Sequence, residues 1–395
     1  MYGSNERIPQ LDGIRGVAIL LVLCWHFFAG ASFQPGNAFL QSLKNMLSFT
    51  WSGVDLFFVL SGFLIGGILM EHKESRNYFK VFYIRRMCRI FPMYFILLFG
   101  FLLLKSVIDN YNNPGSSWLV GGSFSLWPYI TFLQNFYMAI GEYFRPYPLA
   151  VTWSLAVEEQ FYLILPFLLW ALPIKKIPFV CLFLILSAPV IRTLIMIQPF
   201  SINKSAAFIL LPSRMDSLLI GVIGAWMMRN EDCRNILRNN VDSITLAFMV
   251  LFTGTLLFSI GNFGHLSLEM TPMGYTWLAI LYLFLIFIGI LSEKAWIESV
   301  LTAMPLRWLG RRSFTIYLFH LMFLGIFHCL MSKSAPPLEG DHGLLSSVSA
   351  LISTILFASV SWNAIEKPFI RFGRRFRYAQ ADEETDYKRQ IQGFV

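Results

Sequence analysis

Two ionisable side chains in the first apolar segment of the chain could do chemistry together, Arg15 and His26. On an α-helix each residue adds a rotation of about 100° and a rise of about 1.5 Å. Over the eleven positions from Arg15 to His26, the two side chains therefore point within about 20° of each other, about 16 Å apart along the axis. Histidine can take a proton from a hydroxyl near neutral pH, which arginine cannot do well. A permanently charged guanidinium suits a phosphorylated ligand. The pair therefore predicts a functional site in which His26 takes a proton and Arg15 meets a phosphorylated ligand, against the simpler interpretation of His26 as a packing residue.

An arginine cluster precedes the third apolar segment and consists of Arg85, Arg86 and Arg89. Arg85 and Arg89 lie one helical turn apart, as neighbouring anchors for one ligand would. The guanidinium fork matches phosphate oxygens better than a lysine ammonium does. We expect the cluster either to bind the phosphates of a cofactor or to anchor the chain at the inner membrane surface.

Three carboxylates lie in apolar surroundings, where a charge usually faces a bundle interior or a cavity. Asp55 is expected either to pair with an arginine or to line the site. Glu158 and Glu159 point about 100° apart on a helix, and Glu158 shares its face with Tyr162. One glutamate would pair with an arginine while the other orients His26, and the spacing does not decide which.

Other polar residues could support the site. Arg214 and Asp216 are separated by about 200° on a helix, so we expect each to pair with a different neighbour. His320 lies one turn after Tyr317, and its expected role is packing or hydrogen bonding. Asp12 precedes Arg15 by three residues. The five cysteines show no spacing typical of metal ligands, and no metal site is predicted.

The elements that must position these residues are apolar helices. Of 395 residues, 56% are hydrophobic and only 14% are charged, whereas a soluble domain has about 45–50% apolar and about 25% charged residues. This composition excludes a water-soluble fold. It predicts an all-α polytopic membrane bundle of about ten helices, since each spanning helix needs roughly 20 apolar residues. The apolar segments are 14–33, 50–70, 90–108, 150–172, 177–197, 206–228, 243–261, 273–291, 313–331 and 344–363.

The basic residues are distributed asymmetrically over the connections between these segments. With the N-terminus inside, 23 of the 31 Lys and Arg residues fall in inside segments and four fall in outside segments. This bias predicts that both termini are cytoplasmic. The net charge of +8 then reflects topology, and we expect no nucleic-acid partner. The basic start of the tail is expected to contact anionic lipid.

The long outside connection 109–149 carries several interfacial aromatic residues. Because Trp and Tyr concentrate at membrane–water boundaries, we expect an interfacial or partly re-entrant segment that packs on the outer face. The aromatic residues are Trp118, Trp127, Tyr129 and Tyr143.

Seven segments in order along nearly the whole chain resemble the acyltransferase-3 superfamily of integral membrane O-acyltransferases. The arginine and histidine separated by ten residues in that family are matched by Arg15 and His26, and its arginine motif by Arg86, Arg89 and Pro92. The segments are LDGIRGVAILLVLCWH (11–26), GVDLFFVLSGFLI (53–65), RRMCRIFP (85–92), TWSLAVEEQFYLILP (152–166), SRMDSLLIG (213–221), LGRRSFTIYLFH (309–320) and IEKPF (365–369).

The resemblance implies a ten-helix bundle in the bacterial inner membrane. Members move an acyl group, commonly acetyl from acetyl-CoA, to a hydroxyl of a carbohydrate or another acceptor. We expect a transmembrane acyltransferase domain at 1–371 and a cytoplasmic tail at 372–395. Some members add an esterase-like domain outside the membrane, and this chain is expected to act without one.

The expected roles follow from the resemblance and the residue chemistry together. His26 would be the general base or a transient acyl carrier, while Arg15 and the arginine cluster would hold the CoA phosphates or the acyl carbonyl. Asp55 and one of the two glutamates would orient this core. Expected partners are a carbohydrate acceptor, membrane lipid and proteins of polysaccharide assembly.

Two other functions fit buried ionisable residues. A secondary transporter would use a His/Glu proton relay, although we find no similarity between the two halves of the chain. An acyl-group exporter or scaffold would act with a separate transferase. Consumption of acetyl-CoA distinguishes the enzyme from the transporter.

Overall fold

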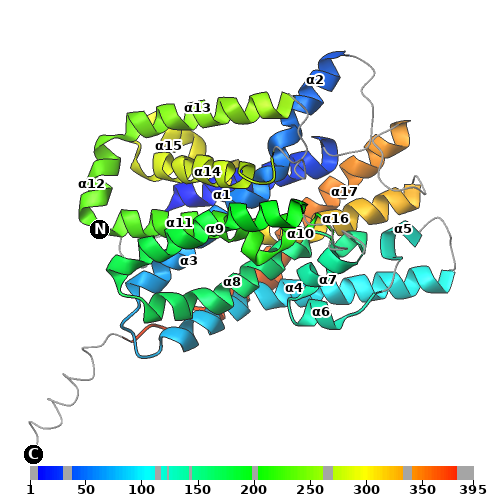
Figure 1. The fold of residues 1–395 in the computed structure, drawn as a ribbon. Coiled ribbons are helices and arrows are strands. Elements are labelled where there is room, and N and C mark those ends of the chain that lie inside the picture. Colours follow the sequence, from blue (N-terminus) through cyan, green and yellow to red (C-terminus); the bar gives the residue numbers. More distant parts are fainter. Residues whose placement is uncertain are drawn as a thin grey trace, which may run out of the picture.

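The computed structural model describes residues 8–29, 38–111, 117–121, 124–141, 145–197, 203–260, 270–331 and 340–379. Every regular element in these ranges is a helix, which confirms the all-α class (Figure 1). The long helices are α1 (Pro9–Cys24), α3 (Gly53–Glu71), α4 (Tyr78–Tyr111), α8 (Thr152–Ala171), α9 (Ile177–Ile197), α11 (Leu211–Arg229), α13 (Val241–Ile260), α14 (Gly274–Leu291), α16 (Met304–Met331) and α17 (Gly340–Ser361).

Shorter helices connect or extend the long ones. Two π-helical turns continue α1 and α17, at Trp25–Ala29 and Trp362–Glu366. The short α-helices are α2 (Ala38–Met46), α5 (Ser117–Val120), α6 (Trp127–Ile130), α7 (Gln134–Ile140), α10 (Ala206–Ile209), α12 (Glu231–Asn239), α15 (Ala295–Leu301) and α18 (Lys367–Gly373). The 3-10 helices are Leu47–Ser52, Tyr147–Leu149 and Ile174–Lys176.

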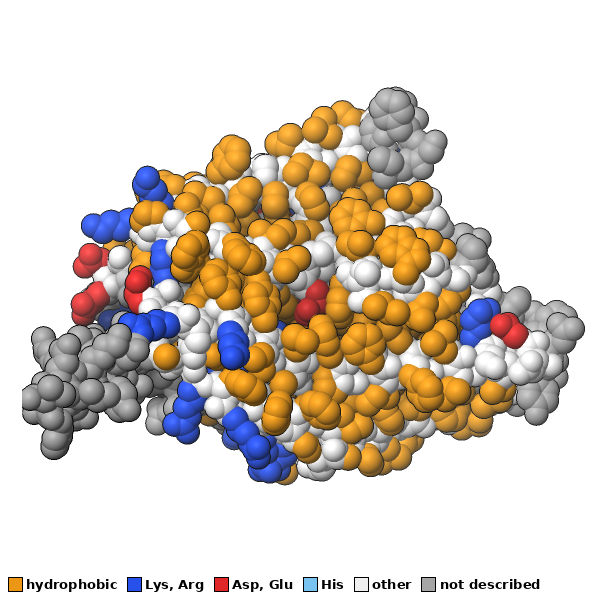
Figure 2. All heavy atoms as spheres, turned by 90° about the horizontal axis from the view of Figure 1, so that it is seen from below, with side chains coloured by type: hydrophobic (Ala, Val, Ile, Leu, Met, Phe, Trp, Pro, Cys, Tyr) orange, Lys and Arg blue, Asp and Glu red, His pale blue; other side chains and the backbone are white. Residues whose placement is uncertain are grey.

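In the described part of the chain, ten helical stretches are long and apolar enough to cross a membrane, as the sequence predicts. The surface between their ends is mainly apolar, and most visible Lys and Arg side chains gather towards one end of the face drawn in Figure 2. The stretches are Pro9–Ala29, Gln41–Glu71, Tyr78–Asn110, Tyr147–Ala171, Ile174–Ile197, Ala206–Arg229, Val241–Ile260, Gly274–Leu291, Met304–Met331 and Gly343–Gly373.

Several helices extend beyond their apolar segments. The clearest case is α4, which begins at Tyr78, whereas the apolar segment begins at residue 90. Helical hydrogen bonds do not require apolar side chains, and 78–89 contains neither glycine nor proline to interrupt them. As a result the arginine cluster lies on a continuous helix and keeps a fixed register with the part of α4 inside the membrane.

The centre of the bundle is built where α3 crosses α11 and where α1 crosses α16. The backbones of α3 and α11 nearly touch, because a Cβ atom on Gly62 would lie 1.8 Å from the carbonyl oxygen of Leu218. On the facing helix, a Cβ atom on Gly221 would lie 2.1 Å from the carbonyl oxygen of Val59. Small residues allow such close packing in membranes, where apolar surface alone gives little drive for association.

The connection between α4 and α8 folds back onto the bundle as short helices. Tyr129 and Gln134 are fully buried in it, whereas Trp127 is exposed. The Tyr94 hydroxyl of α4 donates a hydrogen bond to the Tyr129 carbonyl, at 2.7 Å. The segment therefore packs as a partly buried cap, while Tyr143 lies outside the described residues.

We predict that Gly62→Ala destabilises the bundle, because the added methyl group meets the backbone of α11. Forcing such atoms into a packed core costs about 1–3 kcal/mol, so the melting temperature of the detergent-solubilised protein should fall. Gly67→Ala on the same helix is the matched control, because its methyl group would meet only the guanidinium end of Arg229. Equal melting temperatures for the two variants would contradict the close packing of α3 and α11.

Candidate active site

One elongated cavity of about 890 Å³ lies between α1, α3, α4, α8 and α16. Its volume falls in the usual range of ligand pockets, about 300–1,000 Å³. Residues of α3 and its C-cap line it from Val54 to His72, which spans about 27 Å at 1.5 Å per residue. We call the end at His72 the inner end, following the predicted topology, and the end at Val54 the outer end. The cavity suits a long, narrow ligand.

Arginine dominates the charge of the cavity. Among the described residues, six arginines and two carboxylates line it, a balance that favours an anionic ligand. All four arginines predicted to bind a cofactor are among them, and two more come from the segment that follows α18. The arginines are Arg15, Arg85, Arg86, Arg89, Arg374 and Arg377, and the carboxylates are Asp12 and Glu158.

Arg15 reaches the cavity from α1 beside a carboxylate. The nearest oxygen of Asp12 lies 3.6 Å from a guanidinium nitrogen of Arg15. The other Asp12 oxygen accepts a hydrogen bond from Nε of Arg311 at 3.2 Å. Two arginines from α1 and α16 therefore share the Asp12 carboxylate.

Glu158 is the glutamate of the adjacent pair that lines the cavity. It interacts electrostatically with Arg86 and Arg89 from α4. One turn along α8, the Tyr162 hydroxyl forms a hydrogen bond with Ser61 of α3, and the Arg86 guanidinium lies 5.9 Å from the Tyr162 ring centroid. Glu159 is not among the lining residues, and its Oε1 is buried without a hydrogen-bond partner in the described part of the chain.

Tyr317 of α16 and Ser154 of α8 line the outer part of the cavity. Their hydroxyl oxygens lie 2.5 Å apart, and the Tyr317 hydroxyl also donates to the Val151 carbonyl at 3.2 Å. The ring of Tyr317 packs 6.0 Å from that of Phe57, another lining residue. These contacts hold a phenol hydroxyl at this part of the cavity wall.

His26 and His320 lie next to each other beyond Tyr317. Their ring centroids are 4.7 Å apart in an edge-on arrangement, and the His320 ring is 5.9 Å from that of Tyr317. His26 sits in the π-helical turn at the end of α1 and is half-buried, whereas His320 is fully buried. Neither histidine lines the cavity itself. Single π turns inside helices occur frequently at functional sites.

Hydrogen bonds determine which ring nitrogen carries the proton in both histidines. Nδ1 of His26 lies 2.9 Å from the Val22 carbonyl, and Nδ1 of His320 lies 2.7 Å from the Tyr317 carbonyl. A carbonyl only accepts, so Nδ1 is the donor and Nε2 keeps its lone pair. Nε2 of His320 is buried and has no partner among the described residues. Each Nε2 is therefore available to accept a proton.

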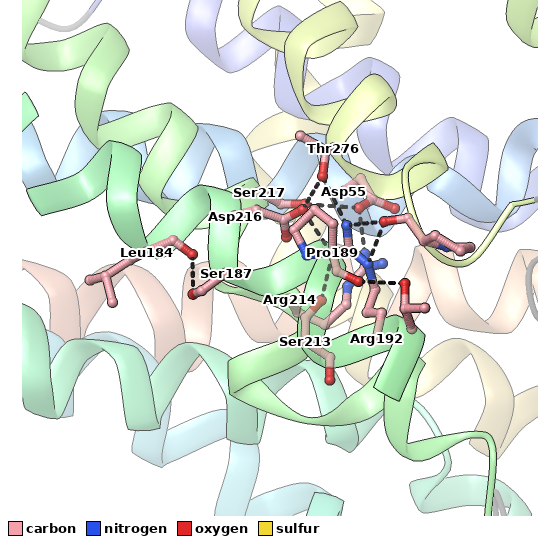
Figure 3. Close-up of polar contacts among 12 residues, drawn as sticks. Asp55, Leu184, Ser187, Pro189, Arg192, Ser213, Arg214, Asp216, Ser217 and Thr276 are labelled. Carbon is pink, nitrogen blue, oxygen red and sulfur yellow. Dashed lines mark hydrogen bonds and ion pairs between the residues drawn. The ribbon is translucent and has the colours of Figure 1, made fainter. Parts of the chain in front are cut away.

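A second polar cluster lies away from the cavity, at the start of α11 (Figure 3). Arg214 pairs with Asp55 of α3, and Arg192 of α9 pairs with Asp216 at 2.8 Å. All four side chains are fully buried, and Thr276 donates to the Asp216 carboxylate at 2.5 Å. As their angular separation predicts, Arg214 and Asp216 bond to different helices. Asp55 forms the arginine pair that was one of its two expected arrangements, and it does not line the cavity.

The sequence interpretation did not include Glu366 among the site residues. Glu366 lies in the π-helical turn after α17, is 4% exposed and accepts a hydrogen bond from Thr315 at 2.6 Å. It also interacts electrostatically with Arg89, which lines the cavity. The Glu-Lys-Pro sequence within IEKPF was the available signal, but on its own it is also typical of a helix end.

Comparison with known proteins adds the family. Residues 8–363 match the acyltransferase-3 family, described as an acyltransferase domain. The chain belongs to the acyltransferase-3 family. No solved structure matches it significantly.

Relatives of this acyltransferase-3 chain come from several bacteria. It is 30% identical over 389 residues to SACOL0978 of Staphylococcus aureus, provisionally named an O-acetyltransferase, covering 94% of this chain and 59% of the relative. It is 25% identical over 414 residues to the peptidoglycan O-acetyltransferase OatA of Listeria monocytogenes, covering 97% of this chain and 59% of OatA. It is 28% identical over 410 residues to YrhL of Bacillus subtilis, provisionally named a peptidoglycan O-acetyltransferase, covering 95% of this chain and 58% of YrhL. The chain thus spans about three-fifths of their length.

The buried cluster of this acyltransferase-3 chain gives a stability prediction. Arg214→Met should leave the Asp55 carboxylate buried without its partner and cost about 3–5 kcal/mol. The double variant Asp55→Leu/Arg214→Met removes both charges, so it should recover much of that loss. Thermal unfolding in detergent, followed by size-exclusion fluorescence, measures both effects. Losses that simply add in the double variant would show that the two residues do not act as a pair.

Proposed function

We propose that this chain is a membrane O-acyltransferase that moves an acetyl group from acetyl-CoA to a hydroxyl of a carbohydrate. The observation that carries the proposal is an arginine-lined cavity whose outer part adjoins two neighbouring histidines through Tyr317. Family membership and the O-acetyltransferase names of relatives support the reaction class. The site would lie in the bacterial cytoplasmic membrane, with both termini on the cytoplasmic side.

The donor would enter from the inner end. The phosphates of acetyl-CoA carry several negative charges, and Arg85, Arg86 and Arg89 offer guanidinium groups there. The remaining length of the cavity would hold the narrow pantetheine arm. Its thioester would lie towards Tyr317, on the side of the cavity nearest the histidines.

His26 would act as the general base. Its Nε2 lone pair would take the proton of the acceptor hydroxyl as the hydroxyl oxygen attacks the thioester carbonyl. The carbon–sulfur bond then breaks, the acetyl group remains on the acceptor as an ester, and the CoA thiolate receives the proton from His26. This step needs a small movement of donor or side chain, because His26 adjoins the cavity only through its neighbours. Arg15 would bind a phosphate or polarise the acyl carbonyl.

The other predicted residues would hold the site residues or their helices in position. Glu158 would hold Arg86 and Arg89 in place through its charge, with Tyr162 alongside it. His320 would keep the His26 ring in position through its edge contact. Asp55, Arg214 and Asp216 would fix α11 against its neighbours and so act on the site indirectly.

A cell-surface polysaccharide or its lipid-linked precursor would be the acceptor. Two relatives are named for peptidoglycan, and at 25% and 28% identity these names support a carbohydrate class without selecting one. Proteins of polysaccharide assembly and membrane lipid would be its partners.

We predict that His26→Ala lowers acetyl transfer by about 10²–10⁴-fold, because general-base catalysis contributes on that order. The measurement is acetylation of surface glycans by mass spectrometry, together with thiol release from acetyl-CoA in membranes. His328→Gln is the matched control, since His328 lies on α16 and bonds Ser347 at 3.0 Å. Wild-type transfer in His26→Ala at equal expression would reject the assigned base.

Thiol release also separates the rival functions. A transporter with a His/Glu relay leaves acetyl-CoA intact, so the purified wild-type protein would release no CoA. An exporter that passes the acetyl group to a separate transferase would release CoA without forming an ester in the purified system. The proposed enzyme releases CoA and acetylates an added carbohydrate acceptor.

A further inference from the structure

The segment after α18 crosses the inner mouth of the cavity. We call residues 374–379 the strap. Asn77, in the connection between α3 and α4, donates from its side chain to the Arg377 carbonyl and accepts from the Ala379 amide, both at 2.9 Å. Nε of Arg85 donates to the Phe376 carbonyl at 2.9 Å. Figure 1 shows this red end of the described chain beside the blue connection that follows α3. The strap is therefore fixed to elements about 300 residues earlier in the chain.

An aromatic stack also fixes the strap to the end of α3. The rings of His72 and Tyr378 are 3.9 Å apart at an interplanar angle of 14°, and the Arg85 guanidinium lies 5.1 Å from the Tyr378 ring centroid. Burial lowers the pKa of His72, so its ring is neutral at pH 7 and can stack without a charge of its own. Burial also raises the pKa of Tyr378, so its hydroxyl keeps its proton.

The strap also forms part of the cavity wall. Arg374, Arg377 and Tyr378 line the cavity, and His72 and Arg85 line the same mouth from the other side. The Tyr378 hydroxyl is buried and has no hydrogen-bond partner among the residues that the structure describes. Leaving such a group unbonded costs about 1–3 kcal/mol, which favours a ligand atom that bonds it. The strap thus presents guanidinium groups, two flat rings and a phenol hydroxyl to one ligand end.

This combination matches a phosphorylated nucleoside. Nucleobases stack on aromatic rings and on guanidinium planes. One arginine guanidinium can also donate two hydrogen bonds to two oxygens of the same phosphate. We propose that the strap and His72 form the binding site for the 3′-phosphoadenosine end of the acyl-CoA donor. This inference rests on the proposed function, and it assigns the donor's nucleotide to residues outside the arginine cluster of α4. The pyrophosphate would then meet that cluster one step deeper in the cavity.

Donor truncation tests the assignment. Arg374→Ala/Arg377→Ala should raise KM for acetyl-CoA by about 10- to 100-fold, since one charged hydrogen bond contributes about 1.5–3 kcal/mol. KM for S-acetylpantetheine, which lacks the nucleotide, and kcat for both donors should stay within about twofold of the wild type. Arg375→Ala is the matched control, because Arg375 also belongs to the strap but contacts the Phe372 ring at 5.9 Å and does not line the cavity. Equal changes for both donors would overturn the assignment.

Direct binding separates this inference from the proposed function. Adenosine 3′,5′-bisphosphate should bind the detergent-purified full chain in calorimetry, and the double variant should lose about tenfold or more in affinity while Arg375→Ala does not. That pattern supports the nucleotide site whether or not acetyl transfer is detected, and absent turnover contradicts the proposed function alone. Unchanged binding in the double variant overturns the nucleotide site.

The same arginines could instead contact the phosphates of anionic lipid. The kinetic comparison is therefore made in phosphatidylcholine vesicles and in vesicles that also contain phosphatidylglycerol. A KM effect of equal size in both supports the nucleotide site. An effect confined to the anionic vesicles assigns the arginines to lipid and overturns it.

Discussion

The structure depends on one constraint, which is that charge inside an apolar bundle must be paired or must face a cavity. Both arrangements occur on α3, on different faces of the helix. Its Asp55 pairs with Arg214 at the crossing with α11, whereas Ser61 faces the cavity that holds Arg86 and Glu158. The buried pairs bond α11 to α3 and to α9, and they leave the cavity with an excess of arginine. One face of α3 thus carries the buried ion pair that stabilises the bundle, and another face lines the cavity that attracts an anionic ligand.

The length of the cavity relates this charge pattern to function. Lining residues extend about 27 Å along α3, close to the roughly 30 Å of a hydrocarbon core. A donor bound as proposed, at the inner arginines, would therefore place its reactive end near the opposite side of the membrane without being transported. The histidines lie beyond Tyr317, outside the cavity lining. The tyrosine therefore lies between the cavity and the residue proposed as the base.

Hydropathy predicted the ten helices and their approximate positions, because membrane spans are determined by length and apolarity. The four arginines predicted to bind cofactor all line the cavity. The ideal helical spacing that aligned Arg15 with His26 did not include the π-helical turn at Trp25–Ala29. Arg15 lines the cavity, whereas His26 contacts His320.

Partners from distant segments were not accessible to sequence reasoning. Arg192 lies within the apolar segment 177–197, and it bonds Asp216, Thr276 and the Pro272 carbonyl from other segments. The sequence does not distinguish Glu158 from Glu159, because the difference depends on the neighbouring helix α4. Glu158 faces the cavity and interacts with Arg86 and Arg89 of α4, whereas Glu159 does not line the cavity. The basic start of the tail predicts contact with anionic lipid, and the sequence did not indicate that Arg374, Arg377 and Tyr378 also line the cavity mouth. Residues 380–395 are outside the described chain.

The central claim is that acetyl-CoA lies lengthwise in this cavity. A cryo-electron microscopy structure in a lipid nanodisc with a thioether analogue of acetyl-CoA tests it most directly. We predict analogue density with its pyrophosphate against Arg85, Arg86 and Arg89 and its thioether beside Tyr317. Density for the analogue elsewhere, or a lipid chain filling the cavity at saturating analogue, would contradict it.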